Sequence, residues 1–328
     1  MPRRALISLI LRVSGNVNAD ASGGPRIPLK KIITWNQEVR PFVSARCVRR
    51  CIRERLYEKG LPIDPLQMVG RGERQQLGDV GDPVEYVDDD IFGFLSPQER
   101  QVIPLHRIGP IKVSHLISLR HAEIKVEFAG RFQRDFLSEY TKGPPVPFDV
   151  ELADWLGRLN VIISDEIGRF SDRELTEEAK EKLGGRLMLP DNERRKRLSS
   201  FLEVLLWEGW TFPRGSQSPC VPEFYYAVIG LTSRFTPIFG YVDITEDGKL
   251  DMSRIEKMRR LYDQLLDKLF MLDYRDGRYL KYCYSRKEGE EGKEERCEEG
   301  DLSSDTMRAI LNEILDYVIP QQGGCSSP

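Results

Sequence analysis

The chain has 328 residues, of which 40% are hydrophobic and 31% charged, so it is long enough to bury a sizeable core. Its formal net charge of only −3 excludes a protein that is basic over its whole surface. No run of about eighteen apolar residues occurs and no cleavage site follows the apolar residues 5–11, so we expect a cytoplasmic protein with no membrane partner.

Positive charge is concentrated near the amino terminus. Residues 1–60 contain thirteen Lys and Arg against four Asp and Glu, a net charge of +9, which leaves −12 for the remainder. Opposite charges on separate surfaces of one chain favour head-to-tail contact between copies of it.

The first predicted element is a strand over residues 5–13 (ALISLILRV). One face of this segment is apolar throughout, and the other is interrupted by Ser8 and Arg12, which predicts a strand at the centre of a sheet. A polar, Gly- and Asn-rich loop follows over residues 14–26.

A basic amphipathic helix is predicted over residues 43–56 (VSARCVRRCIRERL), with Ser44 as its N-cap and Gly60 as its stop signal. At about 100° per residue, four arginines fall within one arc of this helix. This arginine stripe consists of Arg46, Arg49, Arg50 and Arg53. Only Glu54 and Glu58 supply nearby carboxylates, so the stripe is predicted to be mostly unpaired. Two interpretations stay open, a solvated helix face and a polyanion site whose spacing suits consecutive phosphates.

The rest of the chain predicts an insertion followed by strands and helices. Residues 61–110 show no sustained period, which indicates the insertion. Strands are predicted within residues 111–128, 161–170, 223–231 and 237–244. Helices are predicted over about 174–183, 192–207, 253–270 and 303–318. Ser253 and Glu256 are predicted to form a capping box. The NERRKR segment is interpreted as a solvated helix start, and the acidic residues 285–301 are interpreted as a mobile surface loop.

This order favours an α+β fold with a ferredoxin-like or RRM-type βαββαβ palm, large insertions and carboxyl-terminal helices. We expect one domain over residues 1–328. A doubly wound parallel fold fits less well, because neither GxGxxG nor GxxxxGK[ST] follows the first strand.

Few residues are placed to do chemistry. The three histidines, His106, His115 and His121, are paired with no nucleophile or carboxylate in a catalytic pattern. Asp88, Asp89 and Asp90 are consecutive, so they do not converge easily on a cation, and we expect them to be solvated. We therefore predict no catalytic residue, no metal site and no cofactor.

The six cysteines form neither a CxxC pair nor a zinc-ligand pattern with the histidines. Cys47 and Cys51 lie one turn apart on the apolar face of the basic helix, where we expect buried, unreactive thiols. If the abundance of Arg and Glu reflects a thermophile, a disulfide between Cys283 and Cys297 would be an option.

Three motifs carry a resemblance to a known family. The segment VSARCVRRCIRE (43–54) resembles a Ser-led basic first helix, DDDIFGF (88–94) an Asp-x-Phe-Gly insertion, and RIGPIKVSHLISL (107–119) the strand region that follows it. Together with the apolar first strand they resemble the DevR-type branch of the Cas-seven family, the backbone subunit of CRISPR Cascade surveillance complexes.

The resemblance implies an RRM-like palm, a fingers-type insertion over about residues 61–110 and a thumb-type insertion over about 184–222. It further implies a non-enzymatic subunit of a type I Cascade, of subtype I-B or a close relative. The implied partners are the guide RNA (crRNA), target DNA through that guide, copies of the chain arranged head to tail, and other Cascade subunits.

The family's RNA contacts fall on particular residues here. By position, Ser44, Arg46, Arg49 and Arg53 would contact guide phosphates, and Arg50 lies within the same stripe. Asn16 and Asn18 would join them from the first loop, and Arg214 and Ser216 from a segment that resembles the returning thumb, where only Gly215 of the family's paired glycines is present.

Two other functions stay open. One is a DNA-binding transcriptional autoregulator, although no helix-turn-helix pair and no base-reading Asn or Gln among the arginines is evident. The other is an RNA endonuclease of the same superfamily. Related type III subunits use a first-loop aspartate, but Asp20 lies far upstream of Ser44 in a differently built loop, and we interpret it as a turn residue.

Overall fold

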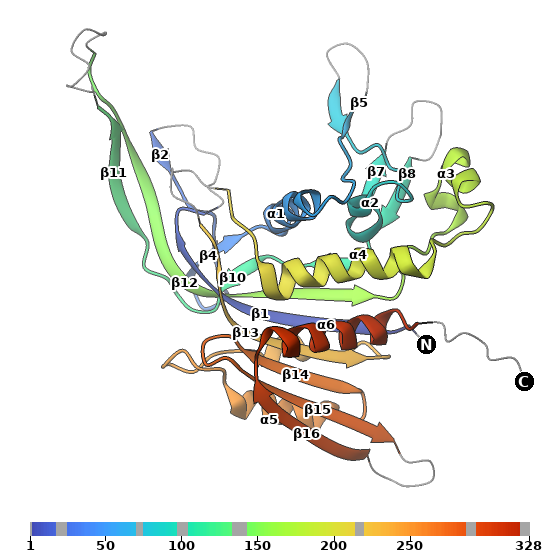
Figure 1. Ribbon diagram of the computed structural model, residues 1–328. Helices are drawn as coiled ribbons and strands as arrows, with labels where there is room; N and C mark the ends of the chain where they lie inside the picture. Colours follow the sequence, from blue (N-terminus) through green and yellow to red (C-terminus); the bar gives the residue numbers. More distant parts are fainter. Residues whose placement is uncertain are drawn as a thin grey trace, which may run out of the picture.

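The computed structural model describes residues 2–17, 25–69, 75–96, 104–132, 143–213, 220–286 and 293–321. Its centre is one large, almost wholly antiparallel sheet (Figure 1). From one edge to the other, the strands are β16 (Lys293–Asp301), β15 (Arg278–Arg286), β14 (Lys268–Asp273), β13 (Glu223–Thr232), β1 (Arg4–Gly15), β12 (Val146–Ser164), β10 (Leu116–Ser118), β4 (Val39–Val43) and β3 (Lys31–Ile33). Three further strands pair with β12, namely β2 (Arg26–Ile27), β9 (Ile111–Val113) and β11 (Lys125–Arg131).

The core of the sheet has the predicted topology. The sequence order β1, α1, β9 with β10, β12, α4 and β13 is a βαββαβ unit, and the sheet places β13 beside β1, β1 beside β12, and β12 beside β9 and β10. The α+β fold class is thus confirmed, and β1 lies in the interior of the sheet as its apolar pattern predicted. The assignment of fingers and thumb to particular ranges stays a prediction.

Helices cover both faces of the sheet. The α-helices are α1 (Ala45–Glu58), α2 (Val87–Phe92), α3 (Glu177–Lys182), α4 (Asp191–Glu203), α5 (Met252–Tyr262) and α6 (Ser304–Val318). Shorter helical segments are η3 (Asp172–Glu174), η4 (Val204–Glu208) and η5 (Ile238–Tyr241). Within the described residues, no helix is both long and apolar enough to cross a membrane.

Strand β1 divides the core into two layers. Ala5, Ile7 and Leu9 lie on the face of the sheet that α1, α4 and α6 cover. Leu6 and Ile10 lie on the other face and pack with residues of α5. Figure 1 shows α1 and α4 on one side of the sheet and α5 on the other. The basic helix is therefore held by the larger of the two hydrophobic layers.

Two protrusions flank α1 on its face of the sheet (Figure 1). On one side, β11 and the first half of β12 form a long hairpin that extends beyond the sheet. On the other side lie α2 and two small hairpins. These hairpins pair β5 (Gln67–Val69) with β6 (Gln76–Gly78) and β7 (Gly93–Ser96) with β8 (Leu105–Ile108).

Four local predictions are wrong in the carboxyl-terminal third. Residues 238–241 form η5, where a strand over residues 237–244 was predicted. Helix α5 is capped by the Asp251 carboxylate, which accepts from the backbone N–H groups of Ser253 and Arg254, so Ser253 is not the N-cap. Helix α5 ends at Tyr262, and β14 begins at Lys268, although the apolar periodicity predicted a helix over residues 253–270. Residues 293–301 of the acidic segment are an edge strand paired with β15, because charged side chains are tolerated at a solvated sheet edge.

The proposed disulfide is excluded by strand register. Cys283 pairs with Arg296 and Cys297 pairs with Tyr282 across β15 and β16, so the two cysteines point to opposite faces of the sheet. Both thiols are free. The sequence could not reveal this, because the register depends on how two strands meet.

Candidate nucleic-acid interface

Helix α1 begins as the sequence predicted. The Ser44 hydroxyl accepts from the backbone N–H of Cys47 at 3.3 Å, and His115 Nδ1 accepts from the backbone N–H of Ala45 at 2.8 Å. The buried face consists of Cys47, Val48, Cys51, Ile52 and Leu56. The arginine stripe therefore lies on the face of α1 that points away from the sheet. Figure 1 shows α1 itself between the two protrusions.

Arg46 and Arg49 carry the uncompensated charge of the stripe. Among the described residues, no carboxylate lies within ion-pairing distance of either guanidinium, and Arg49 Nε is buried without a hydrogen-bond partner. Burial, followed by repulsion from Arg53 and Arg46, lowers the pKa of Arg49. A bound anion would relieve both effects, because it supplies the missing opposite charge.

Arg50 and Arg53 are paired, so the expectation of a mostly unpaired stripe is wrong for these two. Arg50 Nε donates to Glu54 Oε1 at 3.0 Å on the exposed surface. Arg53 Nε donates to Asp88 Oδ2 at 2.7 Å, and its guanidinium lies 5.1 Å from the centre of the Phe92 ring. An RNA contact by either residue stays a prediction.

The last turn of α1 is also neutralised. Arg55 pairs with Glu58, and Lys59 Nζ lies 2.7 Å from Glu203 and 2.6 Å from Glu208. Unpaired positive charge is thus restricted to the amino-terminal half of the helix, around Arg46 and Arg49.

The three consecutive aspartates beside the stripe are buried, which contradicts their predicted solvation. Asp90 accepts from Arg107 at 2.8 Å and from Arg197 at 3.0 Å, and its two oxygens also accept from the backbone N–H of Gly168. This buried Arg–Asp–Arg cluster joins β8, α2 and α4. The burial is possible because two guanidinium groups and one backbone donor replace water around one carboxylate.

Asp88 and Asp89 organise the loops next to α2. Asp88 Oδ1 accepts from the backbone N–H of Asp64 at 2.9 Å, while its other oxygen binds Arg53. Asp89 accepts from the backbone N–H of Asp82 at 3.0 Å. Burial, together with the carboxylates of Asp64 and Asp88, raises the pKa of Asp89 to about 9, so Asp89 is protonated at neutral pH.

The NERRKR segment is not a solvated helix start. Arg194 and Arg197 are 3% and 1% exposed, and Arg194 Nε donates to the backbone oxygen of Ile167 at 2.7 Å. Arg197 reaches the backbone oxygens of Pro83 and Val84 as well as Asp90. These arginines hold α4 to the core and are unavailable to a ligand.

Two glycines allow two of the family-like motifs to lie in close backbone contact. Gly93 has φ +77°, and a Cβ there would lie 2.3 Å from the Arg107 backbone oxygen. A Cβ on Gly109 would lie 2.3 Å from the Phe92 backbone carbon. The segments DDDIFGF and RIGPIK therefore lie in direct backbone contact where β7 and β8 pair, and side chains at these two positions would prevent that contact.

The predicted contacts in the loops have different outcomes. Asn16 is buried, and its Nδ2 donates to the backbone oxygens of Glu151 at 2.8 Å and Ile27 at 3.2 Å, so this amide helps to hold the base of the long hairpin. Its RNA contact stays a prediction. Three further predicted contacts and the aspartate of the first loop lie outside the described residues. These are Asn18, Arg214, Ser216 and Asp20.

The long hairpin carries an aromatic surface that the sequence did not predict. Phe128 and Phe132 are 65% and 60% exposed, and the Phe132 ring lies over Gly130. Phe128 shares its face of the hairpin with Val126, which is also exposed. The alternation of apolar residues along 126–132 was the signal that could have revealed an outward apolar face.

Among the described residues, no three His, Cys, Asp or Glu side chains are placed to hold a metal ion. His115 serves as a hydrogen-bond acceptor at the start of α1, and its ring centre lies 5.3 Å from that of Phe42. The predicted lack of catalysis stays a prediction.

Comparison with known proteins finds a family model that matches part of the chain. Residues 80–239 match the model of a family described as CRISPR-associated negative auto-regulator DevR/Csa2. The match includes the crossing of α2 with β8, whereas the arginine stripe precedes it. No curated protein matches the sequence.

Two solved structures resemble the chain. One is a chain from a CRISPR RNA-guided surveillance complex, pre-nicking, with a TM-score of 0.55 and 13% identity over 95% of this chain and 100% of that one. Another, from a CRISPR RNA-guided surveillance complex, has a TM-score of 0.49 and 12% identity over 94% and 99% of the two chains. The first likeness shows a shared fold. The match of residues 80–239 to the family model confirms the predicted resemblance to the DevR-type family over that range.

Proposed function

We propose that the chain is a backbone subunit of a CRISPR RNA-guided surveillance complex of the Cascade type. It binds the phosphate backbone of the guide RNA, and copies of it assemble head to tail along that RNA. Target DNA is recognised through the guide, and other subunits join the assembly.

One observation carries this proposal. Arg46 and Arg49 lie one turn apart on α1, without carboxylate partners among the described residues, and α1 lies between two protrusions. Guanidinium groups at this spacing match successive phosphates of one strand. The family match and the shared fold support the same function.

The exposed rings of Phe128 and Phe132 add a second element to the proposal. Unpaired bases stack on aromatic side chains with little dependence on sequence, which suits a subunit that accepts any guide. The hairpin that carries these rings is one of the two protrusions on either side of α1 (Figure 1).

The test is a salt titration of single-stranded RNA binding by Arg46→Gln and Arg49→Gln. Each true phosphate contact on a single strand contributes a slope of about −0.7 to the plot of log affinity against log salt, so each variant should flatten the plot by about that amount. The loss should be the same for unrelated RNA sequences, because phosphates carry no base information. Arg260→Gln, on the exposed surface of α5 across the sheet, is the matched control and should change neither affinity nor slope.

Two outcomes would contradict the proposal. Tighter binding to duplex DNA than to single-stranded RNA would favour the auto-regulator role named in the family description. Cleavage of guide-paired target RNA by the purified protein with magnesium or manganese would instead favour the endonuclease, whereas we expect the RNA to stay intact.

A further inference from the structure

A tryptophan is presented to solvent at the tip of the β3–β4 hairpin. Trp35 is 94% exposed, and Ile33 beside it is 70% exposed. The turn is well ordered, because Thr34 N donates to the Glu38 backbone oxygen at 3.0 Å and Gln37 N donates to the Thr34 backbone oxygen at 2.9 Å. The indole is therefore held outward by a closed turn rather than left out of a loose loop.

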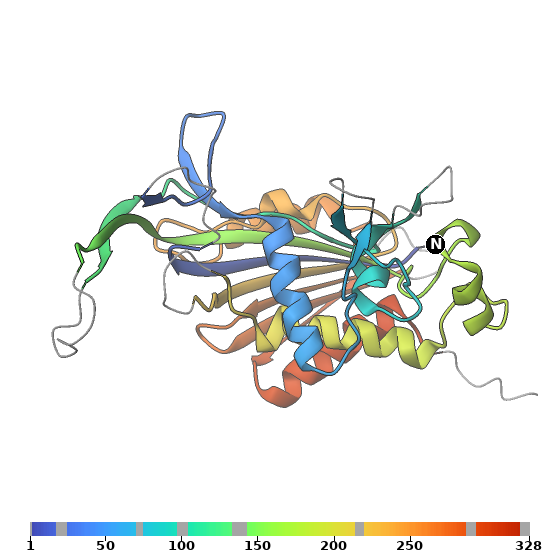
Figure 2. The same ribbon diagram turned by 90° about the horizontal axis from the view of Figure 1, so that it is seen from above.

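This hairpin forms one edge of the sheet. Strand β3 is the last strand on that edge, and β16 is the last strand on the other. Figure 2 shows the hairpin (blue) projecting from one side of the molecule, while the carboxyl-terminal strands (orange to red) lie toward the opposite side.

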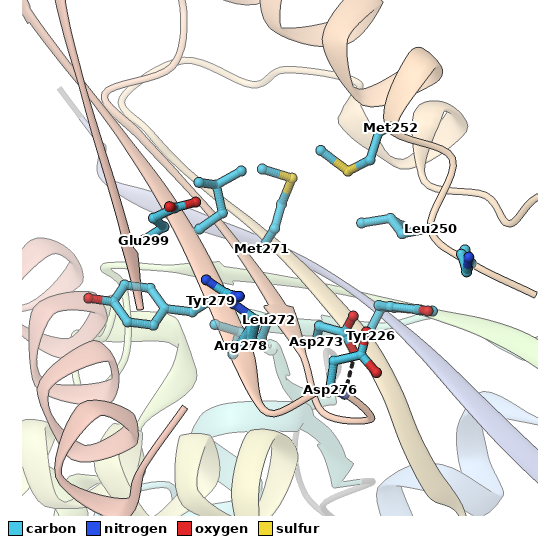
Figure 3. A pocket seen from close by; sticks show the side chains of 12 residues that line it. Tyr226, Leu250, Met252, Met271, Leu272, Asp273, Asp276, Arg278, Tyr279 and Glu299 are labelled. Atoms are coloured by element: carbon cyan, nitrogen blue, oxygen red, sulfur yellow. Dashed lines mark hydrogen bonds between the residues drawn. The ribbon is translucent and has the colours of Figure 1, made fainter. Parts of the chain in front are cut away.

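Near the opposite edge lies a cavity of about 310 Å³ between β14, β15 and the segment that leads into α5. Its apolar lining includes Leu250, Met252, Met271 and Leu280. Figure 3 shows the side chains of Met252 and Met271 pointing into the same space. Methionine side chains adapt their shape to an inserted group, so this lining suits a large flat ring.

The charges around the two features are small. Three acids and two bases surround the cavity, namely Asp273, Asp276, Glu299, Lys249 and Arg278. The hairpin segment 30–43 carries three bases and one acid, namely Lys30, Lys31, Arg40 and Glu38. Lys31 is ion-paired with Glu151 and Arg40 with Glu38, so the excess of bases lies along the strands of the hairpin and not at its tip. The fit therefore depends on the apolar indole and the apolar lining of the cavity rather than on charge.

We propose that Trp35 of one copy inserts into the cavity between Met252 and Met271 of a second copy. The two halves of this contact lie near opposite edges of one sheet, so the contact is heterologous and leaves a free hairpin and a free cavity at the two ends of any assembly. It gives the head-to-tail assembly, which rests on the proposed function, a specific interface. Trp35 would be its central anchor, as buried aromatic side chains commonly are.

A mixed cross-linking experiment tests the contact directly in RNA-free protein. Trp35→Cys and Met252→Cys are prepared as separate variants and mixed at high concentration with a short bismaleimide. We expect a cross-linked dimer in the mixture and none in either variant alone. The single variants also report any background from the exposed native Cys297.

Sedimentation velocity on a long single-stranded RNA measures the contribution of the contact to assembly. Trp35→Ala and Met252→Lys should each raise the protein concentration for half-assembly by about thirtyfold. Two matched controls, Phe235→Ala and Leu261→Lys, replace similarly exposed side chains outside the cavity lining and should have no effect. If circular dichroism shows that Trp35→Ala is unfolded, the assembly of Met252→Lys, on the other side of the contact, tests the proposal.

Binding to an RNA too short for two copies separates this inference from the proposed function. We expect Trp35→Ala and Met252→Lys to bind it as tightly as the wild type. If the wild type binds no RNA, the proposed function is wrong, while the cross-link still decides the interface. A mixture without cross-linked dimer overturns the interface. So does a loss of short-RNA affinity in Trp35→Ala alone, which would make Trp35 a nucleic-acid contact.

Discussion

Arg53 and Asp88 connect the basic helix to the buried acidic helix through a hydrogen bond of 2.7 Å. Asp88 is nearly inaccessible to solvent, whereas Arg53 keeps part of its guanidinium exposed. The pair divides the arginine stripe by role. Its carboxyl-terminal arginine holds α1 to α2, and its amino-terminal arginines, Arg46 and Arg49, stay available for an external anion.

Removal of the cation from this pair should destabilise the fold. Arg53→Gln leaves the buried Asp88 carboxylate without its charged partner, and we expect a loss of about 2 kcal/mol in the free energy of unfolding, less than for a wholly buried pair because Arg53 is partly exposed. Urea titration measures it. Arg50→Gln breaks the exposed pair with Glu54 on the same helix and should change stability by less than about 0.5 kcal/mol. Equal effects of the two variants would contradict the structural role.

Asp89 should make the protein less stable as pH rises. Its pKa is about 9 in the folded chain against 3.8 for the ordinary group, so between these values the folded state binds more protons than the unfolded state. Stability is therefore highest below about pH 4 for this group and falls through the window up to pH 9, by at most about 1.4 kcal/mol per pH unit. Thermal unfolding across this range measures the slope.

Asp89→Asn is the matching variant. The amide keeps an oxygen for the backbone N–H of Asp82 and a donor for the nearby Asp64 carboxylate, without needing a proton. We expect it to be at least as stable as the wild type at neutral pH and to lose this part of the pH dependence. An unchanged slope would show that Asp89 is ionised in the folded chain.

The close backbone contact between β7 and β8 should tolerate no side chain at Gly93. Gly93→Ala combines a positive φ with a close approach to the Arg107 backbone oxygen and should destabilise the chain by about 3 kcal/mol or more. Gly277→Ala also has a positive φ, of +62°, but nothing lies within 4 Å of its Cβ, so it should cost only about 1 kcal/mol. Denaturant midpoints of the two variants separate steric conflict from backbone strain.

The aromatic face of the long hairpin should affect RNA binding and leave the fold intact. Replacing Phe128 and Phe132 by Ser should weaken single-stranded RNA binding at least about tenfold, because stacking contributes about 1–3 kcal/mol per base. Circular dichroism should be unchanged, since both rings are mostly exposed. Val146→Ser alters an equally exposed residue on the other face of the hairpin and serves as the control. Equal losses in both would indicate a general effect on the hairpin.

The elements that the sequence predicted are those whose determinants are local. The interrupted apolar alternation of residues 5–13 placed β1 inside the sheet, and Ser44 defined the start of α1. The family-like motifs were evident for the same reason, because each is a short contiguous run.

The wrong predictions concern residues whose burial depends on partners that are distant in the sequence. Asp90 and Arg197 are each typical of a surface when taken alone, and they are buried because the fold brings them together with Arg107. The role of Arg53 depends likewise on Asp88, thirty-five residues away. The periodicity of a single sequence does not reveal ion pairs that form only in the folded chain. A cluster of charged residues is therefore not by itself evidence that these residues are solvated.

Strand β12 connects the long hairpin rigidly to the sheet, because one continuous strand belongs to both. Residues 153–164 of this strand pair with β1 inside the sheet, and residues 146–152 continue without interruption as one arm of the hairpin paired with β11. Seven residues of ladder reach about 23 Å beyond the sheet without a hinge. A force on the outer end of the hairpin would therefore be transmitted to the sheet through the backbone of β12. The distance that the hairpin spans is fixed by its number of residues.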